Sequence, residues 1–305
     1  MTLPNIVARA GMAAAVIALA ASGFQMPIAI AAPVRSGFVE LSDATIFYRH
    51  AGQGPPVIFI HALLLDSRLW LDQLNVLCAR RYCLAPDLSG FGFSSPMHGG
   101  RVDFSQYADE VIEFLDAMKI REPVDVVAVS AGGNIAALAY LKQPRRFRSL
   151  ALISTGFGVG TLDPATAKYR AENARNLVIE GKDMLFRRFN EYIVDAGASL
   201  VARARYKTMF EQTSYESHVA FLTTTDFPSP ATLPAAIKIP VLLPIGRGDS
   251  VLSVDAADKL AAALPSGRVV RIAAAGRLLP LEAPNELNGA LSQFWVELDH
   301  KGGAK

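Results

Sequence analysis

Short runs of apolar residues alternate with amphipathic stretches along most of the chain. The amphipathic stretches, such as Phe104–Ile120, place apolar residues three and four positions apart, as a helix with one buried face does. The apolar runs have the length of strands buried in a parallel sheet, and they are Val57–Ile60, Tyr82–Pro86, Val126–Val129, Leu150–Ile153 and Val241–Leu243. Strands that alternate with helices predict an α/β fold with a doubly wound, mostly parallel sheet.

The pattern changes between residues 157 and 233. This region is richer in arginine and polar helix formers, and it predicts helices at 165–180, 184–194 and 199–212. After the strand-like run at 241–243, the sequence again predicts helix, strand and helix, at 253–264, 268–272 and 284–296. We therefore predict a core of residues 32–156 and 234–300, interrupted by a helical cap insertion of residues 157–233.

The first 31 residues are typical of a secretory signal peptide. Arg9 precedes the uncharged apolar segment Ala10–Phe24, and Ala29-Ile30-Ala31 offers a small-x-small cleavage pattern. We therefore expect export to the periplasm or the medium. An uncleaved membrane anchor is the alternative, but Gln25 and Pro27 interrupt the apolar run before the roughly 20 residues that a span needs.

Composition narrows the classes of partner. The chain has 305 residues, and its 30 basic and 28 acidic side chains give a net charge of only +2. This balance, with no basic stripe, argues against nucleic acid as a partner. No motif predicts a cofactor or a metal site, and no feature defines an oligomeric state.

The only two cysteines, Cys78 and Cys83, leave two interpretations open. An exported chain can keep a disulfide, and the loop between them is short enough to close. Two inert buried thiols, one ending a helix and one beginning a strand, explain the pattern equally well.

Ser130 interrupts an apolar run abruptly. Val126–Val129 is followed by Ser130-Ala131-Gly132-Gly133 and then by the helical pattern Asn134–Lys142. This order predicts a strand, a sharp turn with strained backbone, and a helix, with the hydroxyl of Ser130 at the apex. Taken alone, the motif also allows the simpler interpretation of a strand that happens to end at a serine.

Several motifs in the right order resemble the α/β-hydrolase fold family, and His61–Trp70 is most similar to its esterases and enol-lactone hydrolases. The matching segments are His61-Ala62, Asp87-x-x-Gly90-x-Gly92-x-Ser94, Ala128-x-Ser130-x-Gly132, Gly246–Asp249 and Gly276–Pro284. The resemblance implies hydrolysis of small esters or lactones, with Ser130 as the nucleophile and Asp249 as the acid of a catalytic triad. It also implies an oxyanion hole made by the backbone N–H groups of Leu63 and Ala131.

Arg277 stands where the family carries its catalytic histidine. A guanidinium has a pKa above about 12 and no acceptor atom, so it cannot act as a general base. We expect it to pair with Asp249. Loss of the triad histidine can lower turnover on the order of a millionfold in a serine protease.

Other residues are weaker candidates. His218, in the predicted cap, and His61, close to the turn at Ser130, are the candidate substitute bases. Cap packing is the simpler explanation for His218, and a structural hydrogen bond is the simpler explanation for His61. Met184, Leu185, Phe186 and Phe189 are expected to pack inside the cap, with an apolar acyl pocket as the alternative.

These residues leave two functions open. The first is a hydrolase of small esters or lactones with an incomplete Ser-Asp triad. The second is a catalytically inactive protein that binds a small anionic ligand through Arg277.

Overall fold

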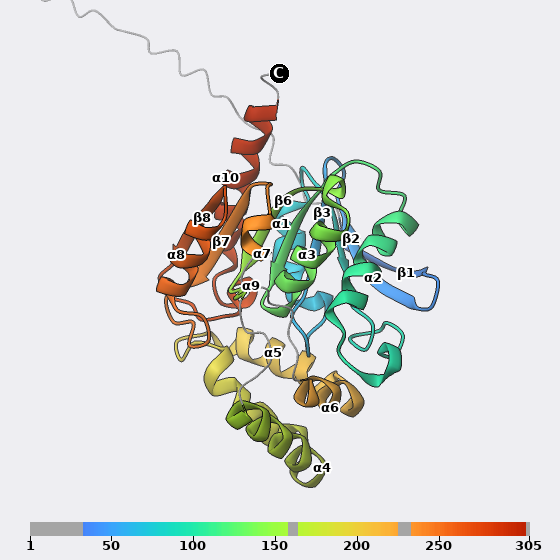
Figure 1. The fold of residues 1–305 in the computed structure, drawn as a ribbon, viewed down its shortest axis with the longest axis vertical. Coiled ribbons are helices and arrows are strands. Elements are labelled where there is room, and N and C mark those ends of the chain that lie inside the picture. The colour runs from blue at the N-terminus through green and yellow to red at the C-terminus, as the bar shows by residue number, and fades with distance from the viewer. Residues whose placement is uncertain (1–32, 158–163, 225–232, 303–305) are drawn as a thin grey trace, which may run out of the picture.

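The computed structural model describes residues 33–157, 164–224 and 233–302 (Figure 1). The predicted signal peptide, residues 1–31, lies outside the described residues, as do residues 158–163 and 225–232 of the predicted cap. No helix in the described part of the chain combines the length and the apolar composition that crossing a bilayer requires.

Eight strands form one sheet in the order β1-β2-β4-β3-β5-β6-β7-β8. They are β1 (Arg35–Glu40), β2 (Thr45–Ala51), β3 (Pro56–Ile60), β4 (Tyr82–Pro86), β5 (Val124–Val129), β6 (Phe147–Ile153), β7 (Val241–Gly246) and β8 (Gly267–Ile272). The first two strands pair antiparallel with their neighbours, and the pairs from β4 to β8 are parallel. The prediction of a mostly parallel, doubly wound sheet is therefore confirmed.

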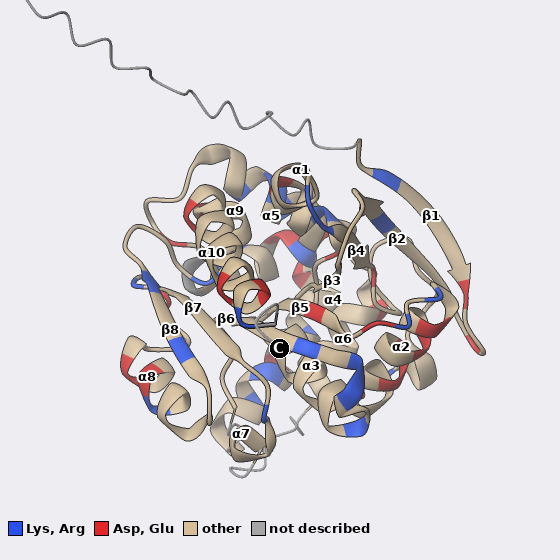
Figure 2. Ribbon diagram, turned by 90° about the horizontal axis from the view of Figure 1, so that it is seen from above, with Lys and Arg blue, Asp and Glu red and all other residues tan. Residues whose placement is uncertain are grey.

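Helices cover both faces of the sheet (Figure 2). One face carries α2 (Phe104–Ala117), α3 (Ala131–Lys142) and α8 (Val254–Ala263), and the other carries α1 (Leu71–Leu77) and α10 (Pro284–Gly302). The short helix α9 (Leu279–Glu282) precedes α10. Because β3 and β5 are covered on both faces, the side chains of Val57–Ile60 and Val126–Val129 are fully buried.

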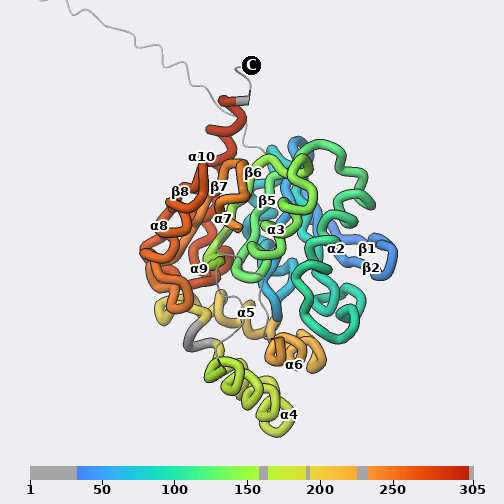
Figure 3. Tube along the Cα trace, in the orientation of Figure 1, coloured from blue at the N-terminus to red at the C-terminus, as the bar shows by residue number. Residues whose placement is uncertain are grey.

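Three helices, α4 (Pro164–Ile193), α5 (Leu200–Gln212) and α6 (Tyr215–Thr223), follow β6 and lie together at one end of the molecule (Figure 3). The short helix α7 (Leu233–Ala236) precedes β7. The helices predicted at 165–180 and 184–194 are two parts of α4, which is interrupted at Gly181, where φ is 80°. The sequence did not predict α6, whose first turn is polar and is capped by Ser214.

Cys78 and Cys83 form a disulfide, with their Cα atoms 5.7 Å apart. Cys78 lies directly after α1, and Cys83 lies in β4. Both residues are buried, so the bond fixes the end of α1 against the sheet. The structure thus selects one of the two interpretations that the sequence left open.

Candidate active site

Ser130 occupies a strained turn between β5 and α3. Its φ of 55° and ψ of −123° lie in a region that residues other than glycine rarely adopt, and such a conformation costs about 1–3 kcal/mol. Hydrogen bonds hold the turn on both sides: Ser130 N donates to Ile153 O over 2.9 Å, and Gly133 N donates to Ser130 O over 3.0 Å. The predicted strand, sharp turn and helix are all present.

The two glycines after the turn are required by close approach of neighbouring segments. A Cβ atom on Gly132 would lie 2.5 Å from the carbonyl oxygen of His61, and one on Gly133 would lie 2.1 Å from Oγ1 of Thr155. Both distances are shorter than real Cβ contacts, so larger side chains would displace the start of α3 from β3 and β6. The small residues therefore keep the Ser130 hydroxyl in place.

Arg277 contacts both other residues of the predicted triad. Its Nη2 donates to Ser130 Oγ over 2.8 Å, and its Nη1 lies 3.4 Å from Asp249 Oδ1. Only 12% of the Arg277 side chain is exposed, and this burial lowers its pKa from the ordinary value, against the opposing effect of the Asp249 charge. The expected pairing with Asp249 is observed, whereas the hydrogen bond to Ser130 was not anticipated.

Asp249 is oriented by backbone groups of its own turn. Its Oδ1 accepts hydrogen bonds from Val251 N over 2.9 Å and Leu252 N over 3.0 Å. Its Oδ2 is buried and has no hydrogen-bond partner among the described residues. The carboxylate is therefore held in place without Arg277, and one of its oxygens remains available as an acceptor.

His61 is occupied by structural hydrogen bonds. Its Nε2 accepts from Leu88 N over 2.9 Å, and its Nδ1 lies 2.8 Å from Ala62 O, so Nδ1 carries the proton. Burial lowers the pKa of His61 and keeps the ring neutral. With both nitrogens engaged, this ring has no free lone pair to accept a proton from Ser130.

His218 lies on α6 and is buried against α5. Its Nδ1 donates to Ser214 O over 2.8 Å, and its ring packs edge-on against Phe210 with centroids 4.6 Å apart. Burial lowers its pKa to about 4, and its Nε2 has no partner among the described residues. His218 does not border the cavity at Ser130, from which Phe210 separates it.

A small cavity of about 100 Å³ adjoins Ser130 and Arg277. Apart from these two residues, its lining is largely apolar, and α4, α5 and α6 all contribute to it. The lining residues are Ala62, Leu63, Leu64, Leu65, Ser130, Ala131, Phe189, Ile193, Tyr206, Phe210, Phe221, Arg277 and Leu278. Leu63 and Ala131, the predicted oxyanion-hole residues, both border it. Because Ala131 begins α3, its N–H has no acceptor within the helix.

The sequence identified only part of this lining. Of the four apolar cap residues considered, Phe189 lines the cavity, while Leu185 and Phe186 are buried and Met184 packs against the core. The sequence did not indicate Tyr206, Phe210 and Phe221, because aromatic residues on a helix carry no signal that separates pocket lining from packing.

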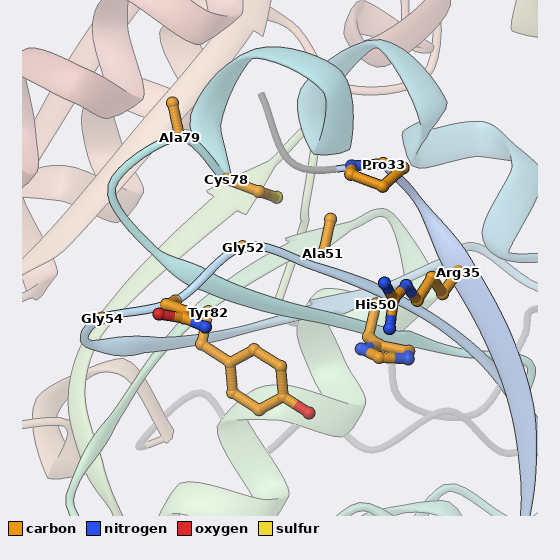
Figure 4. Close-up of a pocket in the computed structure, with 10 residues that line it drawn as sticks. Pro33, Arg35, His50, Ala51, Gly52, Gly54, Cys78, Ala79 and Tyr82 are labelled. Carbon is orange, nitrogen blue, oxygen red and sulfur yellow. The ribbon is translucent and has the colours of Figure 1, made fainter. Parts of the chain in front are cut away.

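A larger surface hollow of about 700 Å³ lies elsewhere, at the edge strands of the sheet (Figure 4). Arg35, His50 and Tyr82 border it, together with Cys78 of the disulfide. None of the predicted site residues lines this hollow. The candidate active site is therefore the smaller cavity at Ser130.

Comparisons with known proteins were made for sequence and for structure. A family model described as alpha/beta hydrolase fold matches residues 55–284. A non-heme chloroperoxidase from Kitasatospora aureofaciens is 36% identical over 110 residues, a match that covers 36% of this chain and 40% of the chloroperoxidase. The match thus spans less than half of that relative.

Solved structures of similar fold include a thermophilic esterase from Thermogutta terrifontis with malate bound. Its TM-score is 0.79 at 21% identity, over 87% of this chain and 99% of the esterase. An enol-lactonase from Burkholderia xenovorans gives a TM-score of 0.76 at 21% identity, over 85% of this chain and 100% of the enol-lactonase. At these identities, the likeness establishes a shared fold.

Proposed function

The chain belongs to the alpha/beta hydrolase fold family, and from this premise we propose that it hydrolyses small esters or lactones slowly, with Ser130 as the nucleophile of an incomplete triad. The observation that carries the proposal is the strained turn, which presents Ser130 Oγ to a cavity bordered by Leu63 and Ala131. Strain of this kind persists where a site requires it.

The proposed reaction begins with attack of Ser130 Oγ on the carbonyl carbon of the substrate. The negative charge that develops on the carbonyl oxygen is stabilised by the N–H groups of Leu63 and Ala131. The C–O bond to the leaving group then breaks and leaves an acyl-serine ester, which water hydrolyses to the free acid and Ser130. Attack by Ser130 and attack by water each require a proton acceptor, whereas the departing alkoxide takes up a proton from water. Arg277 cannot serve as the acceptor.

Arg277 has a different effect on the hydroxyl. Because the guanidinium donates to Ser130 Oγ, it stabilises the alkoxide form of Ser130, while the serine proton passes to hydroxide from solvent. The rate of attack therefore rises with pH. The oxyanion hole and substrate binding alone can retain about 10³-fold acceleration over water, as they do in serine proteases stripped of their triad.

The size of the cavity limits the acyl group. Its volume of about 100 Å³ is less than the roughly 150 Å³ of an engineered protein cavity that holds benzene. Short aliphatic acyl groups and small lactones are therefore the proposed substrates, and the largely apolar lining favours groups that carry few polar atoms.

The test is labelling of the purified protein with a fluorophosphonate, followed by mass spectrometry of the peptide that contains Ser130. We expect an adduct on Ser130 that forms faster as the pH is raised, and no adduct at this peptide in Ser130→Ala. Absence of the adduct at every pH at which the protein remains folded contradicts the proposal.

A second function is favoured by the burial of Arg277. Its positive charge lies beside a cavity, and among the described residues its ion-pair partner is the Asp249 carboxylate at 3.4 Å. A non-catalytic protein could use this charge to hold a small anion such as a short carboxylate. In that case, short carboxylates raise the melting temperature, and Arg277→Ala abolishes the effect. Equal stabilisation of both proteins eliminates this function.

A further inference from the structure

Glu282, the last residue of α9, accepts hydrogen bonds from three backbone N–H groups. The donors belong to two segments that are far apart in the sequence. Its Oε1 accepts from Leu278 N over 2.8 Å. Its Oε2 accepts from Gly276 N over 3.0 Å and from Asp195 N over 2.9 Å. Glu282 belongs to the segment Gly276–Pro284 that resembles the family, but the resemblance implied no role for it, and it lies outside the cavity lining.

Two of these donors flank Arg277. One carboxylate therefore fixes the backbone on both sides of the residue whose guanidinium reaches Ser130. The arginine side chain is long and rotates about several bonds, so its terminal position depends on where its Cα atom is held. A displacement of the 276–278 turn by about 1 Å is enough to misplace a catalytic contact.

The third donor belongs to the link between α4 and α5, residues 194–199. Arg203, on α5, holds this link by donating from Nη2 to Asp195 O over 2.5 Å and to Ala196 O over 2.9 Å. The helices that the link joins carry Phe189 and Tyr206, which line the cavity. A shift of the link would therefore move the helices that carry these two residues of the cavity wall.

The 194–199 link also lies against both turns that carry the charged residues of the site. A Cβ on Gly248, next to Asp249, would be 2.2 Å from Asp195 Oδ2. A Cβ on Gly276, next to Arg277, would be 2.9 Å from Asp195 N. The link therefore packs directly against both turns.

Glu282 has no ion-pair partner among the described residues, so backbone N–H groups compensate its charge. Burial raises the pKa of Glu282, and the three hydrogen bonds oppose that rise. Glu282 is half-buried, and a carboxylate that loses such donors without recovering them from water is left unsatisfied, which is costly. The three hydrogen bonds are therefore expected to form and break together.

We propose that Glu282 is a positioning residue that couples the 194–199 link to the 276–278 turn, so that the cavity wall and the Arg277 guanidinium move together. The effect of this coupling on turnover rests on the function proposed above, whereas the coupling itself does not. Opening of the cavity would then release Arg277 from Ser130, and closure would restore the contact.

Hydrogen–deuterium exchange of the full chain tests the coupling. In Glu282→Gln, an amide N–H₂ group replaces one acceptor, and we expect peptides covering 194–199 and 276–278 both to exchange at least tenfold faster. Glu110→Gln is the control, because the Glu110 carboxylate likewise accepts two hydrogen bonds, from Ser89 N and Ser89 Oγ, and neither donor belongs to the 194–199 link or the 276–278 turn. Faster exchange in only one of the two segments, or in neither, overturns the proposal.

A second variant approaches the coupling from the cap and serves even if Glu282→Gln does not fold. Arg203→Met removes the side chain that holds the link and leaves Glu282 untouched. We expect exchange at 276–278 to rise severalfold, and to be unaffected by Arg205→Met on the same helix, where Arg205 pairs instead with Asp72. An unchanged 276–278 peptide in Arg203→Met contradicts the coupling.

These outcomes separate the two proposals. If Ser130 is inert to the fluorophosphonate but the two segments exchange together, the hydrolase function fails and the coupling stands. If Ser130 reacts and the segments exchange independently, the reverse holds.

Discussion

Arg277 donates a hydrogen bond to Ser130 Oγ over 2.8 Å, so the serine hydroxyl accepts a bond from the residue at the position predicted for the general base. A general base would have to present a lone pair to the hydroxyl hydrogen. The guanidinium instead occupies a lone pair of the oxygen. The three side chains thus lie as close together as the predicted triad requires, but the hydrogen bond between residues 277 and 130 runs in the opposite direction.

Replacing Arg277 with histidine should create a competent base. Asp249 is already oriented by Val251 N and Leu252 N, and its Oδ2 has no partner among the described residues, so it can accept the N–H of an imidazole. We expect kcat/KM for short esters and lactones to rise between about 10²-fold, the lower range for a general base, and about 10⁶-fold, the cost of a lost triad histidine.

The controls for this substitution are Arg277→Gln and the double variant Arg277→His with Ser130→Ala. Glutamine removes the charge without adding a base, so it should lower kcat/KM, because the Ser130 alkoxide loses the guanidinium that stabilises it. The double variant should lose the gain completely. A gain that survives Ser130→Ala would place the reaction at another residue.

Asp249→Asn should destabilise the fold by leaving the Arg277 charge unpaired. Asparagine keeps an oxygen for Val251 N and Leu252 N, so the substitution isolates the charge. Removal of one partner of a buried pair costs about 3–5 kcal/mol, and the 3.4 Å separation places this pair near the lower end. Chemical denaturation measures the loss, and the double variant with Arg277→Met should recover most of it. Simple additivity of the two changes would show that the pair does not interact.

The sequence predicted the fold well where burial is uniform. The runs at Val57–Ile60 and Val126–Val129 are apolar throughout because both faces of β3 and β5 are covered, and a buried parallel strand leaves that signal. Helix α6 leaves none, because Ser217 and His218 are polar but buried. Tertiary contacts hold them: Ser217 Oγ donates to Gly90 O, and His218 packs against Phe210.

In the site, too, some features leave a signal in the sequence and others depend on tertiary contacts. Ser130 and Asp249 follow parallel strands, and the carboxyl ends of such strands meet at one edge of a sheet, so their proximity to Arg277 could be predicted. The hydrogen bond from Arg277 to Ser130 depends on side-chain direction. The role of Glu282 depends on its contact with Asp195, which lies 87 positions earlier in the chain. Neither relationship is encoded in a local pattern.

Phe189→Ala should change the preferred length of the acyl group. Phe189 lines the cavity and packs against Phe210 and Phe221, so truncation enlarges a volume of about 100 Å³. Each methylene accommodated in a hydrophobic pocket changes specificity by about 1–3 kcal/mol. We expect the ratio of kcat/KM for hexanoyl over acetyl 4-nitrophenyl esters to rise at least tenfold. Val178→Ala, on the exposed face of the same helix, should leave the ratio unchanged.

Reduction of the disulfide should lower stability modestly. Cys78 and Cys83 are five positions apart, so the bond closes a short loop and removes little entropy from the unfolded chain. The loop-entropy relation gives about 2 kcal/mol for a loop of this length. Denaturation of the Cys78→Ser, Cys83→Ser double variant measures the difference. A loss above about 5 kcal/mol would indicate that packing at these buried positions contributes more than the cross-link.

His218 should make stability fall at acidic pH. Its folded pKa is about 4 because burial disfavours the charged ring, whereas an unfolded histidine titrates near 6.5. Between these values, the unfolded chain binds more protons, so the free energy of unfolding decreases as the pH falls from about 6.5 towards 4. Integration over this range gives a loss of roughly 3 kcal/mol by pH 4.

His218→Asn removes this titration and keeps a side-chain N–H for Ser214 O, the acceptor of the present hydrogen bond. The variant should therefore lose less stability than the original protein between pH 7 and pH 4, by about 3 kcal/mol in denaturant titrations at each pH. His300 is exposed near the end of α10, so His300→Asn provides the control and should leave the pH dependence as it is. Parallel pH profiles for the original protein and His218→Asn would mean that His218 is not held neutral in the folded protein.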